Sequence, residues 1–287
     1  MQWLSGNVKS YIPVDSIEKM KTIIYYFTGT GNSLAAARRI ADKLGECELV
    51  PIASLGREGE RIKPGAERVG IVCPVYDMGV PLVVYEFADR LDVSGAEYCF
   101  GVVTMGGAGA SALHILDKIL KENSKKGLDS GFAVRMPANF PPLFKPPQGE
   151  KKDRILAGAE NRIDMIAEEI KEGRKDYPSF TPLSSLLRII TYGKFLKEVR
   201  GYDKDFFVKD NCTLCGICEE VCPVGNITIT DGKPEWEHKC EMCFACLHFC
   251  PVEAIEWGSR TEGRGRYKHP DLNVSDMKVQ KTAEEQT

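Results

Sequence analysis

The sequence predicts an α/β fold in which a doubly wound parallel sheet of five strands is followed by a small domain rich in cysteine. Apolar runs of strand length alternate with helix-like segments through residues 20–173, which is typical of a parallel sheet covered on both faces. The chain has 287 residues, more than one small module needs when domains have ~100 to 200 residues. Eight of its 11 cysteines lie between residues 212 and 250, which marks a second unit.

The first βα unit is the clearest. Residues 23–27 (IIYYF) are typical of a buried strand, and residues 33–44 place apolar side chains at helical spacing. Further elements follow the same alternation: we expect strands at 48–52, 69–73, 99–104 and 131–136, with helices near 81–91, 110–122 and 152–172.

Two segments differ from this alternation, one between the fifth strand and the following helix and one between the two halves of the chain. Residues 137–148 contain five prolines, which predicts an extended loop long enough to wall a pocket. Residues 174–202 predict an ordered linker, with an amphipathic helix over 183–199.

The distribution of apolar and charged residues argues against a membrane protein, an exported protein and a nucleic-acid-binding protein. No stretch approaches the ~18 apolar residues of a membrane span, and residues 1–19 contain no apolar block of signal-peptide type. We therefore expect a cytoplasmic protein with no membrane span. Residues 202–257 hold 11 acidic against 4 basic residues, and no basic stripe accompanies exposed aromatics, which argues against binding to nucleic acid.

The cysteines form a duplicated motif. Residues 212–223 read CTLCGICEEVCP and residues 240–251 read CEMCFACLHFCP, so a C-x2-C-x2-C-x3-C-P run occurs twice, 28 residues apart. The eight candidate metal ligands are Cys212, Cys215, Cys218, Cys222, Cys240, Cys243, Cys246 and Cys250. Two tetrahedral zinc sites are the alternative, although zinc ligands usually come as separated C-x2-C pairs.

This spacing resembles that of bacterial-type ferredoxins with two [4Fe–4S] clusters, in which the fourth cysteine of each run serves the other cluster. The resemblance implies one cluster on Cys212, Cys215, Cys218 and Cys250, and another on Cys240, Cys243, Cys246 and Cys222. The other cysteines, Cys47, Cys73 and Cys99, are expected to be buried hydrophobes, and the four histidines show no spacing of a shared metal site.

A loop rich in hydroxyls and glycine separates the first strand from its helix. Its backbone N–H groups and the helix dipole favour an anion, so a phosphate is the expected ligand. The loop has no Lys or Arg, and Leu34 stands where a dinucleotide fingerprint has its third glycine. A plain turn capped by Ser33 is the alternative. The segment resembles the T-x-T-G-x-S/T loop of flavodoxins, which implies that Thr28, Thr30 and Ser33 hold the phosphate of FMN.

In the flavodoxin strand order 2-1-3-4-5, ligands bind beyond the carboxyl ends of the strands at the switch point, so the loops after the third and fourth strands become flavin contacts. Tyr76 is the candidate to stack on the ring, with a packed loop aromatic as the alternative. Residues 104–110 contain no aromatic cover, which leaves one flavin face open to solvent, a substrate, Phe140 or a cluster of another subunit. The candidate cofactor-binding residues are Thr28, Gly29, Thr30, Gly31, Asn32, Ser33, Pro74, Val75, Tyr76, Gly79, Thr104, Met105, Gly106, Gly107 and Ala108.

The whole pattern resembles the flavodoxin–ferredoxin fusion family of anaerobic bacteria and archaea. The implied organisation is an extension (1–19), a flavodoxin-like FMN domain (20–173), a helical linker (174–202), a ferredoxin domain (203–257) and a polar tail (258–287). Residues 260–268 carry Arg260, Arg264, Arg266 and Lys268 and are expected to be solvated, with folding back onto the acidic domain as the alternative.

The leading hypothesis for function is an iron–sulfur flavoprotein that moves electrons between two [4Fe–4S] clusters and FMN. The alternative is an FMN-dependent reductase of a small molecule, fed by its own ferredoxin domain. No catalytic residue is assigned and the enzyme class stays open. Redox partner proteins are expected; their identity, the potentials and the oligomeric state, including a homo-oligomer, are left open by the sequence.

Overall fold

The computed structural model describes residues 21–56, 59–107, 110–177 and 185–281. The expected extension at 1–19, Ala108 and the first residues of the expected linker helix lie outside this part of the chain. None of the helices within these ranges combines the length and apolar character that crossing a bilayer requires.

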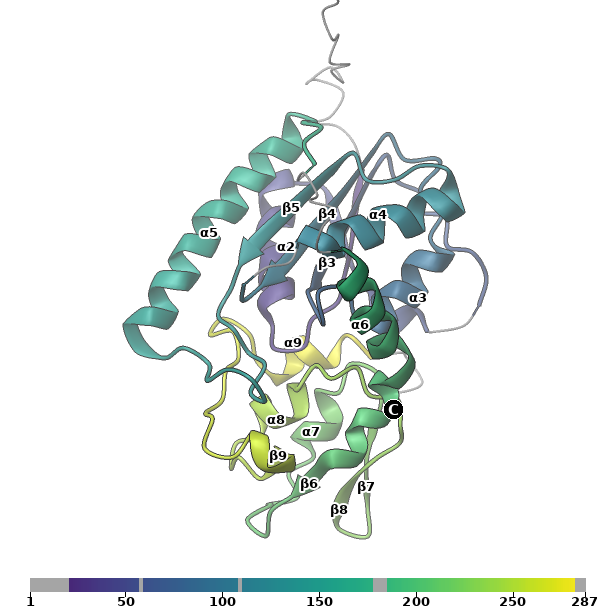
Figure 1. The fold of residues 1–287 in the computed structure, drawn as a ribbon. Helices are drawn as coiled ribbons and strands as arrows, with labels where there is room; N and C mark the ends of the chain where they lie inside the picture. Colours follow the sequence, from purple (N-terminus) through teal and green to yellow (C-terminus); the bar gives the residue numbers. More distant parts are fainter. Residues whose placement is uncertain (1–20, 57–58, 108–109, 178–184, 282–287) are drawn as a thin grey trace, which may run out of the picture.

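The expected parallel sheet is confirmed, with strand order β2-β1-β3-β4-β5 and parallel pairing throughout. Its strands are β1 (Thr22–Tyr26), β2 (Cys47–Pro51), β3 (Arg68–Pro74), β4 (Tyr98–Met105) and β5 (Ser130–Arg135). Its covering helices are α2 (Asn32–Leu44), α3 (Leu82–Arg90), α4 (Ala110–Ser124) and α5 (Gly149–Lys171). Helices α2 and α5 pack together on one face, and α3 and α4 on the other (Figure 1).

The sheet is built from the residues that the sequence pattern indicated. All five residues of β1 are buried, as are the first six of β3, because helices cover both faces. Two clusters of buried side chains lie around the sheet: one contains Ile24 and Ile40, and the other contains Ile23 and Phe87.

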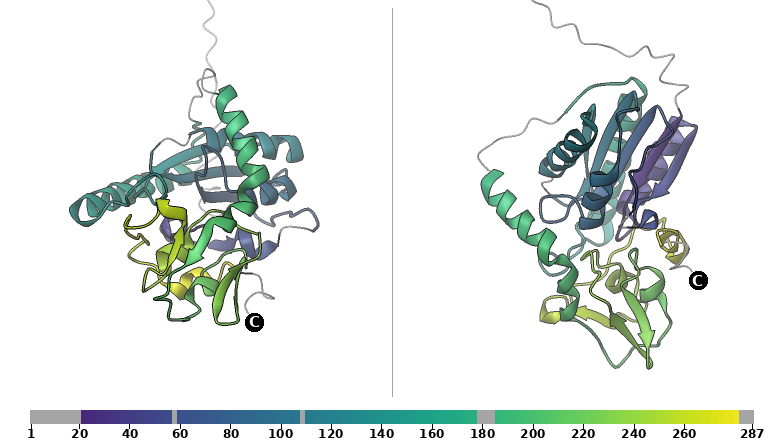
Figure 2. Two further views of the ribbon diagram at one scale, coloured as in Figure 1. Left: turned by 60° about the horizontal axis from the view of Figure 1, so that its bottom comes forward. Right: turned by 90° about the vertical axis from the view of Figure 1, so that its right-hand side faces the viewer.

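The second unit is a small α+β domain at the carboxyl ends of the sheet strands (Figures 1 and 2). Helix α6 (Ser185–Glu198) and the 3-10 turn η3 (Val199–Asp205) lead into it, so the linker helix forms as expected. The domain contains β6 (Phe206–Val208), α7 (Ile217–Glu220), β7 (Ile227–Thr230), β8 (Lys233–Trp236), α8 (Ala245–Phe249) and β9 (Ile255–Trp257). Strand β6 pairs with β9, and β7 with β8, both antiparallel.

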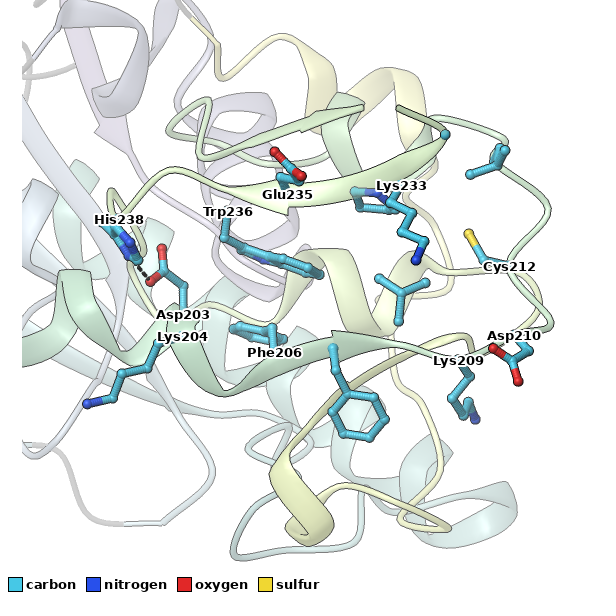
Figure 3. A pocket seen from close by; sticks show the side chains of 15 residues that line it. Asp203, Lys204, Phe206, Lys209, Asp210, Cys212, Lys233, Glu235, Trp236 and His238 are labelled. Atoms are coloured by element: carbon cyan, nitrogen blue, oxygen red, sulfur yellow. Dashed lines mark hydrogen bonds and ion pairs between the residues drawn. The ribbon is translucent and has the colours of Figure 1, made fainter. Parts of the chain in front are cut away.

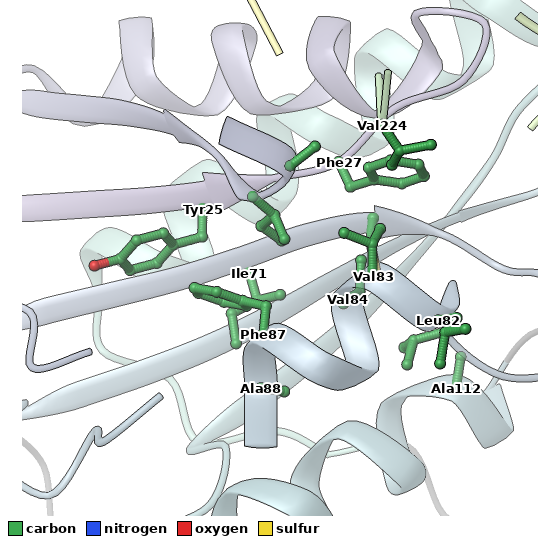
Figure 4. Packing of buried hydrophobic residues seen from close by; sticks show 14 of the residues in the cluster. Tyr25, Phe27, Ile71, Leu82, Val83, Val84, Phe87, Ala88, Ala112 and Val224 are labelled. Atoms are coloured by element: carbon green, nitrogen blue, oxygen red, sulfur yellow. The ribbon is translucent and has the colours of Figure 1, made fainter. Parts of the chain in front are cut away.

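Hydrophobic packing continues from one domain into the other. Val224, after α7, belongs to the same buried cluster as Phe27 at the end of β1 and Val83 in α3 (Figure 4). An uninterrupted apolar contact of this kind holds two domains in one orientation, because separating them would expose buried apolar surface to water.

The expectation that residues 260–268 are solvated holds only in part: Arg260 and Lys268 are exposed, but the segment folds back onto the ferredoxin domain, which was the alternative. Arg266 is half-buried and donates to the buried Glu256 carboxylate at 2.8 Å, and Arg260 lies 4.5 Å over the Trp257 ring. Helix α9 (Val274–Lys278) follows, with Met277 fully buried. The basic residues fold back because the buried carboxylate of Glu256 needs a cationic partner.

Candidate functional site

The fold gathers the eight cysteines into two sets of four. Burial, together with the neighbouring thiols of Cys250, Cys212 and Cys215, raises the pKa of Cys218 to about 12. Cys212, Cys215, Cys218 and Cys250 line one small pocket, so the first three cysteines of one run meet the last cysteine of the other. We call these four residues the outer set.

The second set has the reciprocal composition. Burial, with the nearby thiols of Cys243, Cys222 and Cys240, raises the pKa of Cys246 well above its ordinary value. The thiol of Cys218, in the outer set, also raises the pKa of Cys246, as expected if the two sets lie near each other. We call Cys240, Cys243, Cys246 and Cys222 the inner set.

The sequence duplication is repeated in the backbone. Left-handed conformations occur at Leu214 (φ 54°) and again 28 residues later at Met242 (φ 53°). Cys222 and Cys250 each accept a hydrogen bond at 3.2 Å from the backbone N–H four residues ahead, in Asn226 and Ala254. Hydrogen bonds to cysteine sulfur help to set the reduction potential of an iron–sulfur cluster.

The two sets differ in their access to solvent. In the outer set Cys215 is exposed and Cys212 is half-buried, whereas in the inner set Cys240, Cys246 and Cys222 are each at most 8% exposed. A groove of about 660 Å³ between β6 and the β7–β8 hairpin reaches Cys212 (Figure 3). The stacked rings of Phe206 and Trp236 form part of its wall.

These thiols have the chemistry that an iron–sulfur cluster requires. A ligating thiol must lose its proton, and burial among other thiols opposes that loss unless a metal supplies positive charge. Within the described ranges, no three His, Cys, Asp or Glu side chains are arranged as ligands of a single metal ion. Thiolates are the ligands that hold iron–sulfur clusters in proteins, so the chemistry of the donor set fits such a cofactor.

The inner set lies against the flavodoxin-like domain. A Cβ placed on Gly29 would meet the carbonyl oxygen of Cys243 at 2.7 Å and the Tyr76 hydroxyl at 2.9 Å. The carboxylate of Glu241, 1% exposed, accepts the backbone N–H of Val83 at 3.0 Å. Because Val83 is the second residue of α3, this bond places a negative charge at a helix N-terminus, where the helix dipole favours it.

The predicted phosphate loop is closed in this structure. Every residue from 28 to 33 is buried, and its hydroxyls bond within the chain: Thr28 accepts the Gly31 N–H, Ser33 pairs with Thr104, and Thr30 accepts from Asn139. A Cβ on Gly31 would meet Leu272 at 2.7 Å and His269 at 3.0 Å.

The loop nevertheless keeps a shape suited to an anion, since Gly31 adopts the left-handed conformation (φ 99°) at the start of α2. As folded, however, it has no room for the phosphate of FMN.

The other predicted flavin loops are also covered in part. Tyr76 contacts the Phe27 ring edge-on at a centroid distance of 6.5 Å, and it turns back through paired backbone bonds with Gly79. A Cβ on Gly79 would meet the Tyr192 ring of α6 at 2.1 Å. Pro74, Val75 and Met105 are half-buried, Thr104 is buried, and Gly106 and Gly107 are exposed. Tyr76 is thus a packed aromatic here, and its stacking on a flavin stays a prediction.

Sequence reasoning missed the residues that close the loop. Gln280, 0% exposed, donates to the Thr28 carbonyl at 3.1 Å and accepts the Thr28 N–H at 3.0 Å. Tyr267 donates to the Asn32 side chain at 2.6 Å. The sequence does contain a signal for the helix in this segment: Asn273 and Asp276 form a capping box, a pattern that marks a helix start.

Comparison with known proteins agrees with this architecture. Residues 206–228 match a family model described as a 4Fe-4S binding domain. The "Ferredoxin-like protein in vnf region" of Azotobacter vinelandii is 42% identical over 48 residues, which are 15% of this chain and 74% of that protein. The matched part of the chain belongs to the ferredoxin-like 4Fe-4S proteins, and the sheet in front of it has the strand order of flavodoxins.

Other relatives share only a segment. A component of the ion-translocating oxidoreductase complex of Methanosarcina acetivorans is 40% identical over 62 residues, and the match spans 20% of this chain and 24% of that protein. The chain thus spans about a quarter of the length of this relative. Among solved structures, a flavodoxin from the domain Archaea is 17% identical and covers 53% of this chain and 99% of its own, with a TM-score of 0.35.

Proposed function

We propose that this chain is an electron-transfer protein in which the outer and inner cysteine sets each hold one [4Fe–4S] cluster. The observation that carries the proposal is the exchange of fourth cysteines: Cys250 lines the same small pocket as Cys212, Cys215 and Cys218, and the thiol of Cys222 is near enough to Cys246 to raise its pKa. This is the arrangement expected of a ferredoxin with two clusters. When bound, such clusters take up and release single electrons.

The protein contributes position and environment. Exposed Cys215 keeps the outer set within reach of redox partner proteins, which an electron-transfer domain requires. Burial keeps water from the inner set, and the carboxylate of Glu241 lies beside it. A negative charge there disfavours an added electron, so we expect the inner site to have the lower potential.

Anaerobic reconstitution tests this proposal. The protein should contain about eight irons and as many sulfides per chain, as two [4Fe–4S] clusters require. Its reduced form should show the EPR signature of two interacting clusters. Four irons per chain, or zinc in place of iron, would contradict the two-cluster proposal.

A flavin role depends on the phosphate loop. The FMN-linked electron carrier and the FMN-dependent reductase that the sequence indicates both need this loop to open, because the buried residues 28–33 leave no space for a phosphate. The contact between Gly29 and Cys243 favours the flavin hypothesis, since it places the inner set next to the loop.

For the organisation of the chain we propose a flavodoxin-like domain over 20–173 and a linker over 174–202. The ferredoxin domain starts at 203, and we extend it beyond 257 to residue 281. The extension follows from the buried contact of Arg266 with Glu256.

A further inference from the structure

The C-terminal segment 267–281, which we call the clasp, lies over the predicted phosphate loop. The Gln280 side chain holds both the N–H and the carbonyl of Thr28, as a neighbouring strand would. The backbone N–H of His269 donates to the Thr30 carbonyl at 2.9 Å. The clasp therefore satisfies backbone groups at both ends of the Thr28–Thr30 turn.

Side chains of the clasp also fill the space in front of the loop. Leu272, 4% exposed, and His269, 6% exposed, pack against Gly31 next to the start of α2, where a Cβ on Gly31 would meet them at 2.7 Å and 3.0 Å. Tyr267 binds the side chain of Asn32, the first residue of α2. An anion bound by these backbone groups would have to displace the clasp.

The clasp is anchored on both domains. On the flavodoxin-like side, the Asp276 carboxylate accepts from Arg38 at 2.7 Å. On the ferredoxin side, Met277 packs in a buried cluster with Val221 and Phe249, and the N–H of Tyr267 donates to His248 at 3.1 Å. Its other contacts to the flavodoxin-like domain are hydrogen bonds to the loop and the side chain of Leu272, which packs in the same buried cluster as Ile24. The apolar contact of Met277 with the ferredoxin domain is separate from these, so release of the loop would leave it in place.

We propose that the clasp and the phosphate group of FMN compete for the loop at residues 28–33, so that the flavin site opens only when the clasp releases the loop. A ligand that binds a partly populated open state has its apparent affinity reduced by the open fraction. Weakening the clasp should therefore strengthen FMN binding. This competition is independent of how many clusters the chain holds.

Equilibrium dialysis of FMN against the reconstituted full-length protein tests the competition. The variant Gln280→Ala removes both side-chain bonds to Thr28 and favours the open state. We expect its dissociation constant for FMN to be lower than that of the wild type by about tenfold, the factor that corresponds to 1.4 kcal/mol. The matched control is Val279→Ala, because Val279 is the neighbouring residue and is 48% exposed; it should bind FMN as the wild type does.

A second variant and a second measurement keep the test decisive if Gln280→Ala folds poorly. Asp276→Asn weakens the ion pair to Arg38 at the partly exposed edge of the clasp and should also strengthen FMN binding. In the wild type, saturating FMN should accelerate hydrogen exchange in residues 267–281. Equal FMN affinities in all variants, unchanged exchange in FMN-bound protein, or no FMN binding by any variant at millimolar concentration would each overturn the proposal. Iron analysis of the same samples reports separately on the two-cluster proposal.

Discussion

The bond from Glu241 to the first turn of α3 offers a direct test of how the two domains are held together. Its carboxylate is 1% exposed and accepts the Val83 N–H at 3.0 Å. The variant Glu241→Gln keeps the size of the side chain and one acceptor oxygen, but it removes the negative charge.

The change in the free energy of unfolding caused by Glu241→Gln is the sum of two stabilising contributions that are lost and one desolvation cost that is reduced. A hydrogen bond to a charged group contributes ~1.5–3 kcal/mol, against ~0.5–1.5 kcal/mol for a neutral one. A carboxylate at a partly buried helix N-terminus contributes up to ~2 kcal/mol through the dipole. Burying an amide costs less than burying a carboxylate, which offsets part of this loss. We expect a net destabilisation of about 1 kcal/mol, or a melting temperature lower by about 2–4 °C for a chain of this size.

The assay is anaerobic thermal unfolding of the reconstituted protein, combined with hydrogen exchange at the Val83 amide. Glu235→Gln is the control, because Glu235 lies exposed on β8 and the substitution changes net charge equally. Glu241→Gln should melt earlier than the control and exchange faster at Val83. If both variants melt together, or if Val83 stays equally protected, the charge of Glu241 does not hold α3 to the ferredoxin domain.

Three further predictions concern the metal sites, the linker helix and the clasp. Cys250→Ala removes a ligand from the outer set only, so iron should fall from about eight per chain toward about four while the inner cluster keeps its EPR signal; loss of the inner signal with the outer one kept would refute the crossed assignment. Gly79→Ala places a Cβ 2.1 Å from the Tyr192 ring and should cost ~1–3 kcal/mol by overpacking, with rescue in unfolding experiments by the added change Tyr192→Leu. Burial lowers the pKa of His269 below its ordinary value of 6.5, despite the nearby carboxylates of Asp271 and Glu160. Because this pKa is lower in the folded protein than in the unfolded chain, the contribution of His269 to stability is fully present above the unfolded-state pKa. That contribution is lost as the pH falls below the unfolded-state pKa. Hydrogen exchange of 267–281, corrected for its intrinsic pH dependence, should therefore rise more steeply between pH 7.5 and 5.5 in the wild type than in His269→Gln, in which His248, whose pKa burial also lowers, still contacts the clasp.

Much of the architecture could be read from local patterns. The apolar residues of β1 and the helical spacing in α2 predicted the first βα unit, and the regular alternation after it predicted a parallel sheet. The boundaries differ from expectation by only a few residues; α5, for example, starts at Gly149 rather than near 152. Patterns of this kind succeed because burial on one or both faces of an element fixes its periodicity.

The flavin loop shows where such reasoning ends. Its hydroxyls and glycines indicated a phosphate, but the same groups serve equally well to bind protein. Thr28 is held by Gln280, 252 residues away in the chain, and Gly29 admits the backbone of Cys243. Glycine permits any close approach, whether of a cofactor or of another segment, so the residue type alone does not name what approaches.

The sequence by itself predicted the alternating strands and helices of the parallel sheet and the duplicated cysteine run, because both depend on spacing along the chain, while the strand order followed from the resemblance to flavodoxins. Only the tertiary structure decided that the inner cysteines lie against the predicted phosphate loop and that residues 267–281 cover it. These contacts join residues more than two hundred positions apart. They arise from apolar burial and from the need of buried polar groups for partners, neither of which leaves a periodic mark in the sequence.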